Sequence, residues 1–100
     1  MIDVEVKYNL ETAVAACRTR GIPLAVAQFS HPSDGFLFVV LIELEWEYVV
    51  WTLNVQTGGF SYGSYFPFDR RDNRNIKVEA FRRYEERMSA DFQFLVSCSN

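Results

Sequence analysis

The chain has 100 residues, of which 49% are hydrophobic and 16% aromatic, and its formal net charge is −3. This length favours a single domain over residues 1–100, and the acidic balance excludes a general electrostatic attraction to nucleic acid. The longest apolar run, residues 36–42, is far shorter than the ~20 residues of a membrane-spanning helix, so we expect no contact with a membrane.

The cysteines and the start of the chain bear on its cellular location. Cys17 and Cys98 lie far apart and form no CxxC motif. The chain does not open on a charged segment followed by an apolar one, so we expect no secretory signal. These features favour a cytoplasmic protein with two reduced thiols. A secreted domain with one disulfide is the alternative.

The first fifth of the chain predicts a short strand and then a helix. Residues 2–8 alternate apolar and polar side chains, the period of a half-buried strand. Asn9 is a suitable N-cap for an amphipathic helix over residues 10–20, whose apolar stripe starts at Leu10. Gly21 is the expected residue just beyond the helix end.

Four strands are predicted in the middle of the chain, near residues 22–29, 36–43, 48–55 and 60–66. Residues 36–55 contain no Gly or Pro, but one strand of that length would span ~66 Å at ~3.3 Å per residue. A domain of this size has a radius of gyration of only ~13 Å, so the run has to break. We place a hairpin turn at Leu44–Glu47, where polar residues interrupt it. Thr57-Gly58-Gly59 predicts a second hairpin, and Gly63 predicts either a bulge or a close backbone approach.

The last third of the chain predicts a second helix. Residues 76–88 are amphipathic, with Asn73 or Asn75 as the N-cap and Val78 on the inward face. Residues 92–96 alternate as a short final strand or a docked tail. The predicted fold class is therefore α+β, with a four-stranded antiparallel meander and two helices in two layers, and a further short strand at each end.

Enzymatic and metal-binding patterns are weak in this sequence. His31 is the only histidine, and it shares one turn with Ser30 and Asp34, whereas a catalytic triad draws its groups from different elements. One histidine and two distant cysteines do not make the usual zinc site. Alternating glutamates from Glu43 favour a solvated strand that resists edge pairing over a cation site. We expect no enzyme activity, no cofactor, no metal and no small-molecule ligand.

Charge and aromatic residues instead favour a binding surface. Residues 1–69 carry three basic and eight acidic residues, whereas residues 70–87 carry seven basic and four acidic ones. The basic segment either pairs with acidic residues of the chain or contacts a partner. Residues 60–66 place aromatics at both parities, with Phe60, Tyr62 and Phe66 on one face, so that one set is buried and the other is exposed or covered by the C-terminal elements.

From these features we expect a protein-binding module. The predicted partner-binding residues are Tyr62, Tyr65, Arg70, Arg71 and Arg74. The partner is a protein, with a homodimer as one form of it. The alternative function is nucleic-acid binding through the Arg70–Arg83 surface together with the hairpin aromatics.

Several motifs of the chain resemble a group of short proteins. They are Tyr48-Val49-Val50-Trp51-Thr52-Leu53-Asn54, Thr57-Gly58-Gly59, Tyr62-x-x-Tyr65-Phe66, and a following helix with Ala80-Phe81 and Arg87. The pattern covers about half of the chain and resembles short uncharacterised bacterial and mobile-element proteins. The resemblance implies no particular activity. At the level of class, small acidic single-domain proteins include phage-borne inhibitors of host defence and DNA mimics, so an inhibitor or adaptor is the expected role.

Overall fold

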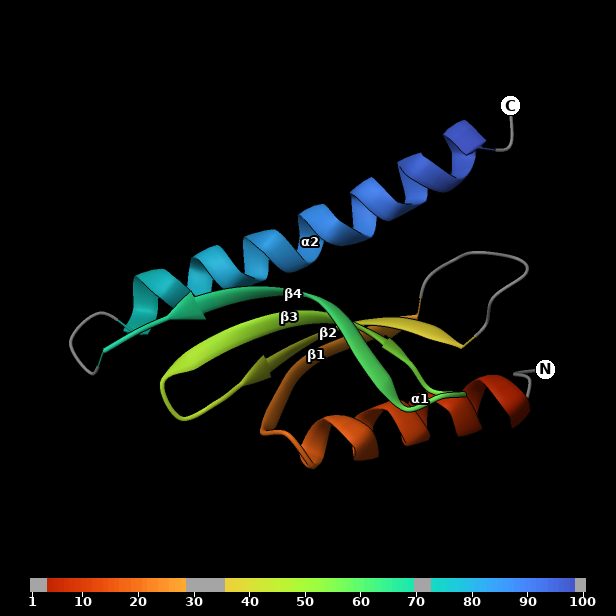
Figure 1. Ribbon diagram of the computed structural model, residues 1–100, viewed down its shortest axis with the longest axis horizontal. Helices are drawn as coiled ribbons and strands as arrows, with labels where there is room; N and C mark the ends of the chain where they lie inside the picture. The colour runs from red at the N-terminus through yellow and green to blue at the C-terminus, as the bar shows by residue number, and fades with distance from the viewer. Residues whose placement is uncertain (1–3, 29–35, 70–72, 99–100) are drawn as a thin grey trace.

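The computed structural model describes residues 4–28, 36–69 and 73–98. These residues form α1 (Val4–Arg18), β1 (Ile22–Gln28), β2 (Leu37–Glu43), β3 (Glu47–Asn54), β4 (Gly59–Pro67) and α2 (Asn73–Cys98). The predicted α+β class is confirmed, because the four strands form one antiparallel sheet in the order β1-β2-β3-β4. The helices lie on opposite faces of this sheet, so the fold has three layers rather than the predicted two (Figure 1).

Both ends of the described chain are helical, and the predicted terminal strands are wrong. α1 begins at Val4, so Asn9 is buried inside the helix and does not cap it. α2 continues to Cys98 and includes residues 92–96. An alternation over five to seven residues also fits part of a helical pattern. A helix satisfies its backbone hydrogen bonds internally, whereas a terminal strand needs a sheet edge to pair with.

The two predicted hairpins are confirmed. At the first, the Leu44 N–H donates to the Glu47 carbonyl oxygen (2.8 Å), and Ile42 pairs with Val49. At the second, Gly58 has a φ of 75°, which its missing Cβ allows. The unbroken apolar run of β2 and β3 is explained by burial on both faces, because a strand covered on each side has no polar face.

Each helix buries two of its residues against the sheet. Ala13 and Cys17 of α1 are buried against one face of the sheet, and Ala80 and Tyr84 of α2 are buried against the other. The predicted stripes are wrong at Leu10 and Val78, which are both exposed, whereas Cys17 of the first stripe and Ala80 and Tyr84 of the second are buried as predicted. The small residues Ala13, Cys17 and Ala80 let each helix approach the sheet closely at these points.

Gly21 follows α1 as predicted, but for a different physical reason. Its N–H donates to the Cys17 carbonyl oxygen (3.1 Å), and it has no positive φ. A Cβ on Gly21 would meet the Glu43 carbonyl oxygen and would lie 2.9 Å from Cδ2 of Leu44. Glycine is therefore needed here because the chain passes close to the end of β2.

The buried thiol of Cys17 should make stability depend on pH in alkaline solution. Burial raises the pKa of Cys17 from 9.0 to about 11. Because the pKa of Cys17 is higher in the folded protein than in the unfolded chain, the free energy of unfolding keeps its full value below about pH 9. It then falls between about pH 9 and pH 11, by up to about 1.4 kcal/mol per pH unit. Urea unfolding across this range measures the loss.

The control for this prediction is Cys17→Ala. Burial also raises the pKa of Tyr84, so the wild-type slope contains a second group. The difference between the two proteins isolates the thiol, and parallel curves for both would contradict the prediction. Cys98, for which a reduced thiol is also predicted, lies outside the described side chains.

Candidate binding surface

A β-bulge interrupts the pairing of β3 with β4. Val50 pairs with Ser64 and Thr52 pairs with Ser61, so Trp51 alone lies opposite Tyr62 and Gly63. The bulge that Gly63 predicted is therefore confirmed. Tyr62 absorbs the distortion with a φ of 55°, and it is the only residue other than glycine with a positive φ in the described chain.

The bulge turns the two ends of β4 toward opposite faces of the sheet. Phe60 packs with the core cluster on the α1 side, and Phe66 packs with the cluster on the α2 side. In a regular strand, residues six apart share a face. The predicted common face of Phe60, Tyr62 and Phe66 is wrong because one extra residue reverses the alternation.

Trp51 lies at the centre of an aromatic cluster on the α1 side of β3 and β4. Its ring centroid is 5.1 Å from that of Phe60 and 6.1 Å from that of Tyr65, and the Tyr65 contact is edge-on. The Trp51 Nε1–H donates to the Tyr65 hydroxyl (3.4 Å). Arg20 lies over the rings, with its Cζ 4.6 Å from the Phe60 centroid. These residues, Arg20, Trp51, Phe60 and Tyr65, are called the Trp51 cluster below.

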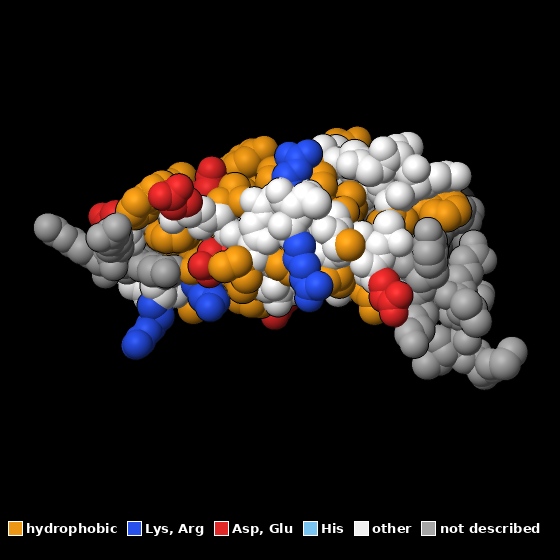
Figure 2. Space-filling model, turned by 90° about the horizontal axis from the view of Figure 1, so that it is seen from below, with side chains coloured by type: hydrophobic (Ala, Val, Ile, Leu, Met, Phe, Trp, Pro, Cys, Tyr) orange, Lys and Arg blue, Asp and Glu red, His pale blue; other side chains and the backbone are white. Residues whose placement is uncertain are grey.

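The Trp51 cluster lies beyond the part of the sheet that α1 covers. α1 packs against β1 and β2, whereas the three aromatic residues of the cluster belong to β3 and β4. Hydrophobic side chains reach the surface of this face between scattered charged groups (Figure 2). The guanidinium of Arg20 lies over the rings of Trp51 and Phe60 and covers them where α1 does not. Cation–π attraction favours this placement.

The missing side chain of Gly63 leaves room for the Tyr65 ring beside Trp51. A Cβ on Gly63 would lie 2.6 Å from ring carbons of Tyr65, so the ring occupies the place of a side chain. Tyr65 nevertheless stays 55% exposed, and Tyr62 beside it is 79% exposed. Both predicted tyrosines are therefore exposed on β4, with Tyr65 oriented by its contacts with Trp51 and Tyr62 located in the bulge.

β4 is also an open edge of the sheet. The Phe68 N–H donates to the Trp46 carbonyl oxygen (2.9 Å), so these two residues form a hydrogen-bonded pair. In an antiparallel ladder such pairs alternate with pairs whose backbone groups point away from each other. Ser64 and Phe66 accordingly turn their backbone groups to β3, and Tyr65 turns its N–H and C=O to the open edge. The nine residues of β4 include no charged side chain, and only the bulge and Pro67 disfavour edge pairing.

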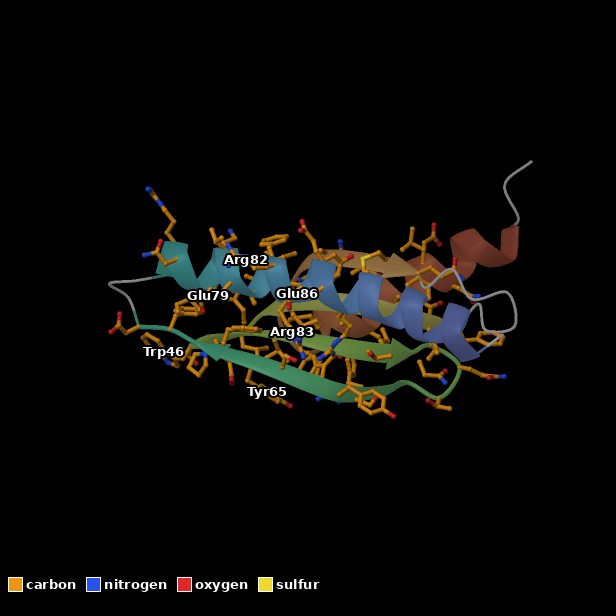
Figure 3. All side chains as sticks on the ribbon, turned by 90° about the horizontal axis from the view of Figure 1, so that it is seen from above. Trp46, Tyr65, Glu79, Arg82, Arg83 and Glu86 are labelled. Carbon is orange, nitrogen blue, oxygen red and sulfur yellow. The ribbon has the colours of Figure 1, made fainter. Side chains whose placement is uncertain are left out.

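Two arginines of α2 form hydrogen bonds with β3 and β4 beside the bulge. Arg87 donates to the Val50 carbonyl oxygen (3.1 Å) and to the Ser64 hydroxyl (2.7 Å). Arg83 lies on the side of α2 that faces β4 (Figure 3) and donates to the same hydroxyl (3.3 Å). It also pairs with Glu86 (3.5 Å). These contacts fix the strand on which both tyrosines stand.

The basic part of the predicted site does not join the tyrosines. Arg70 and Arg71 lie outside the described residues. Arg74 is exposed on α2, across the sheet from the Trp51 cluster. Sequence reasoning missed Arg20 and Trp51 as neighbours of Tyr65, because no local pattern links positions so far apart in the chain.

Comparisons with known proteins do not add to this surface. No protein-family model, curated protein or solved structure matches the chain. Within the part of the chain that the structure describes, no three His, Cys, Asp or Glu residues come together as metal ligands. Over the same residues, no helix is long and apolar enough to cross a membrane.

Proposed function

We propose that this chain is a non-enzymatic protein-binding module, an inhibitor or adaptor, which contacts its partner through β4 with Tyr62 and Tyr65 as anchors. The observation that carries the proposal is the backbone of Tyr62, which has a φ of 55° while the residue is 79% exposed. A left-handed backbone costs a residue with a Cβ about 1–2 kcal/mol. The exposed ring adds little to folding, so a tyrosine kept at a strained position points to a role in binding.

The surroundings of Tyr62 support this role. Tyrosine is enriched among the residues that dominate binding energy, and a ring held in place loses little entropy on association. Tyr65 is held by the Trp51 hydrogen bond and by its contact with Gly63. Its backbone groups face the open edge, where an extended segment of a partner can add a strand.

A photo-crosslinking residue at Tyr62 tests the proposal in cells that express the full chain. We expect a covalent adduct with one partner protein from position 62, and none from Gln56, an exposed position in the β3–β4 turn. With that partner purified, Tyr62→Ala and Tyr65→Ala should each cost about 2 kcal/mol of binding free energy. This loss corresponds to roughly thirtyfold in affinity. Equal crosslinking from both positions, or unchanged affinity of both variants, would refute the assignment.

Nucleic-acid binding is the second candidate function. Arg74, Lys77 and Arg82 are exposed on α2, and this observation favours it. The Trp51 cluster lies across the sheet from them, so bases stacked on those aromatics would not reach the same cations. Mobility shifts with generic RNA and DNA decide the matter. Tight binding that is lost by about 200 mM salt, and by replacing Arg74 and Arg82, would favour this candidate.

A further inference from the structure

A shallow groove with a cationic rim runs along α2. Its volume is about 460 Å³, and it is lined by Arg74, Lys77, Val78, Phe81, Arg82 and Glu85. The apolar floor includes Val78, which is 53% exposed. Arg82 lies on the side of α2 away from β4 (Figure 3), so this groove is separate from the Tyr62 surface. The charged residues of the lining are three cations and one carboxylate, Glu85, so the groove has a net positive charge. An apolar floor with this charge fits an apolar side chain that is flanked by carboxylates.

The β2–β3 hairpin carries such a group at its tip. Trp46 is 47% exposed, and it stands between Glu45, which is exposed, and Glu47. Neither Glu45 nor Trp46 is a favoured turn residue, and neither has a positive φ. The geometry of the turn therefore does not explain the choice of these two residue types. Exposed tryptophan is the residue type most often found to dominate an interface.

We propose that the Glu45-Trp46-Glu47 tip of one copy occupies the α2 groove of a second copy. The indole ring lies on Val78 and Phe81, and the two carboxylates face cations of the rim. The lining residues extend over ~16 Å of helix at ~1.5 Å per residue. Paired strands are only ~4.8 Å apart, so a hairpin tip fits within that length.

The positions of the tip and the groove favour a closed dimer. Trp46 and the start of α2 lie at the same end of the molecule (Figures 1 and 3). A two-fold axis at that end lets each copy place its tip in the groove of the other, and such an isologous contact closes without forming a filament. The exposed tyrosines of β4 take no part, so this dimer and the proposed partner binding can fail independently.

Charge reversal with mixing tests the dimer. One variant reverses the tip (Glu45→Arg with Glu47→Arg), and the other reverses the groove (Arg74→Glu with Arg82→Glu). Analytical ultracentrifugation should show a concentration-dependent dimer for the wild type, weakened more than about tenfold in either variant because like charges then face each other. An equimolar mixture of the two variants should restore the dimer as a heterodimer, since each tip again meets a groove of opposite charge.

The controls separate this contact from unfolding and from general charge effects. Glu11→Arg and Arg18→Glu reverse exposed charges on α1 and should leave the dimer unchanged. Trp46→Ala should weaken it, Tyr62→Ala should not, and circular dichroism confirms that each variant is folded. A wild type that is monomeric up to about 500 µM at low salt would overturn the proposal, because specific dimers of this kind form well below that concentration. Two weakened variants that stay monomeric when mixed would also overturn it.

Discussion

Replacing Trp51 with alanine is expected to lower the free energy of unfolding by about 3–5 kcal/mol. Trp51 is only 8% exposed and belongs to the α1-side core, where it contacts Phe60, Tyr65 and Arg20. Removing the ring leaves a cavity and deprives the Tyr65 hydroxyl of its donor. Since a domain of this size has a total stability of about 5–15 kcal/mol, the variant should be marginal at best. Urea denaturation followed by circular dichroism measures the change.

The chain offers a matched control in its second tryptophan. Trp46 is half-exposed at a hairpin tip, so Trp46→Ala, measured at low concentration, should cost much less, within about 1 kcal/mol. Trp51→Phe should also lose less than Trp51→Ala, because it keeps an aromatic ring beside Phe60. Equal destabilisation by the two tryptophan-to-alanine changes would contradict the central place of Trp51 in the cluster.

Replacing Tyr62 with glycine is expected to change stability and binding in opposite directions. Glycine adopts the φ of 55° without strain, so the free energy of unfolding should rise by about 1 kcal/mol despite the greater freedom of the unfolded chain. The same change removes the exposed ring, so affinity for the crosslinked partner should fall by about 2 kcal/mol or more. Thermal or urea unfolding gives the first quantity, and titration with the partner gives the second.

Tyr62→Ala separates the two effects. Alanine removes the ring but keeps the Cβ that strains a left-handed backbone, so it should lose affinity as glycine does without the gain in stability. If the glycine variant is less stable than wild type, the exposed ring supports the fold. If it binds as tightly as wild type, Tyr62 is not an anchor. Either result would contradict the interpretation of Tyr62 on which the proposed function rests.

Local patterns predicted the middle of the chain well, for identifiable physical reasons. A run of 20 residues without Gly or Pro has to break to fit a small domain, and it breaks at Leu44–Glu47. Gly58 supplies the positive φ of the second hairpin, and Gly63 marks the bulge. The terminal segments were predicted less well. Although the helix period of about 3.6 residues differs from the strand period of 2, a pattern of only a few residues fits both. Tertiary contacts then decide which of the two forms.

The predicted binding residues also include some that local sequence placed correctly and one, Arg74, that it did not. Tyr62 and Tyr65 are close in the sequence and lie on one strand, where both are exposed. The prediction that Arg74 joins them rested on chain proximity alone, and α2 carries this residue to the opposite side of the sheet. Arg20 and Trp51 complete the surface instead, from an early loop and a central strand.

The sequence by itself determined the elements of this protein that depend on neighbouring residues, namely the four strands, their hairpins, the bulge and the existence of two helices. Only the tertiary structure decided which side chains face solvent. One extra residue opposite Trp51 reverses the alternation of β4, and no local pattern reports how a partner strand accommodates it. Because α1 lies on β1 and β2, the rings of Trp51 and Phe60 are covered by Arg20 instead. Exposure of Tyr62 and Tyr65 follows from these long-range contacts, because burial depends on what packs across the sheet and not on residue type.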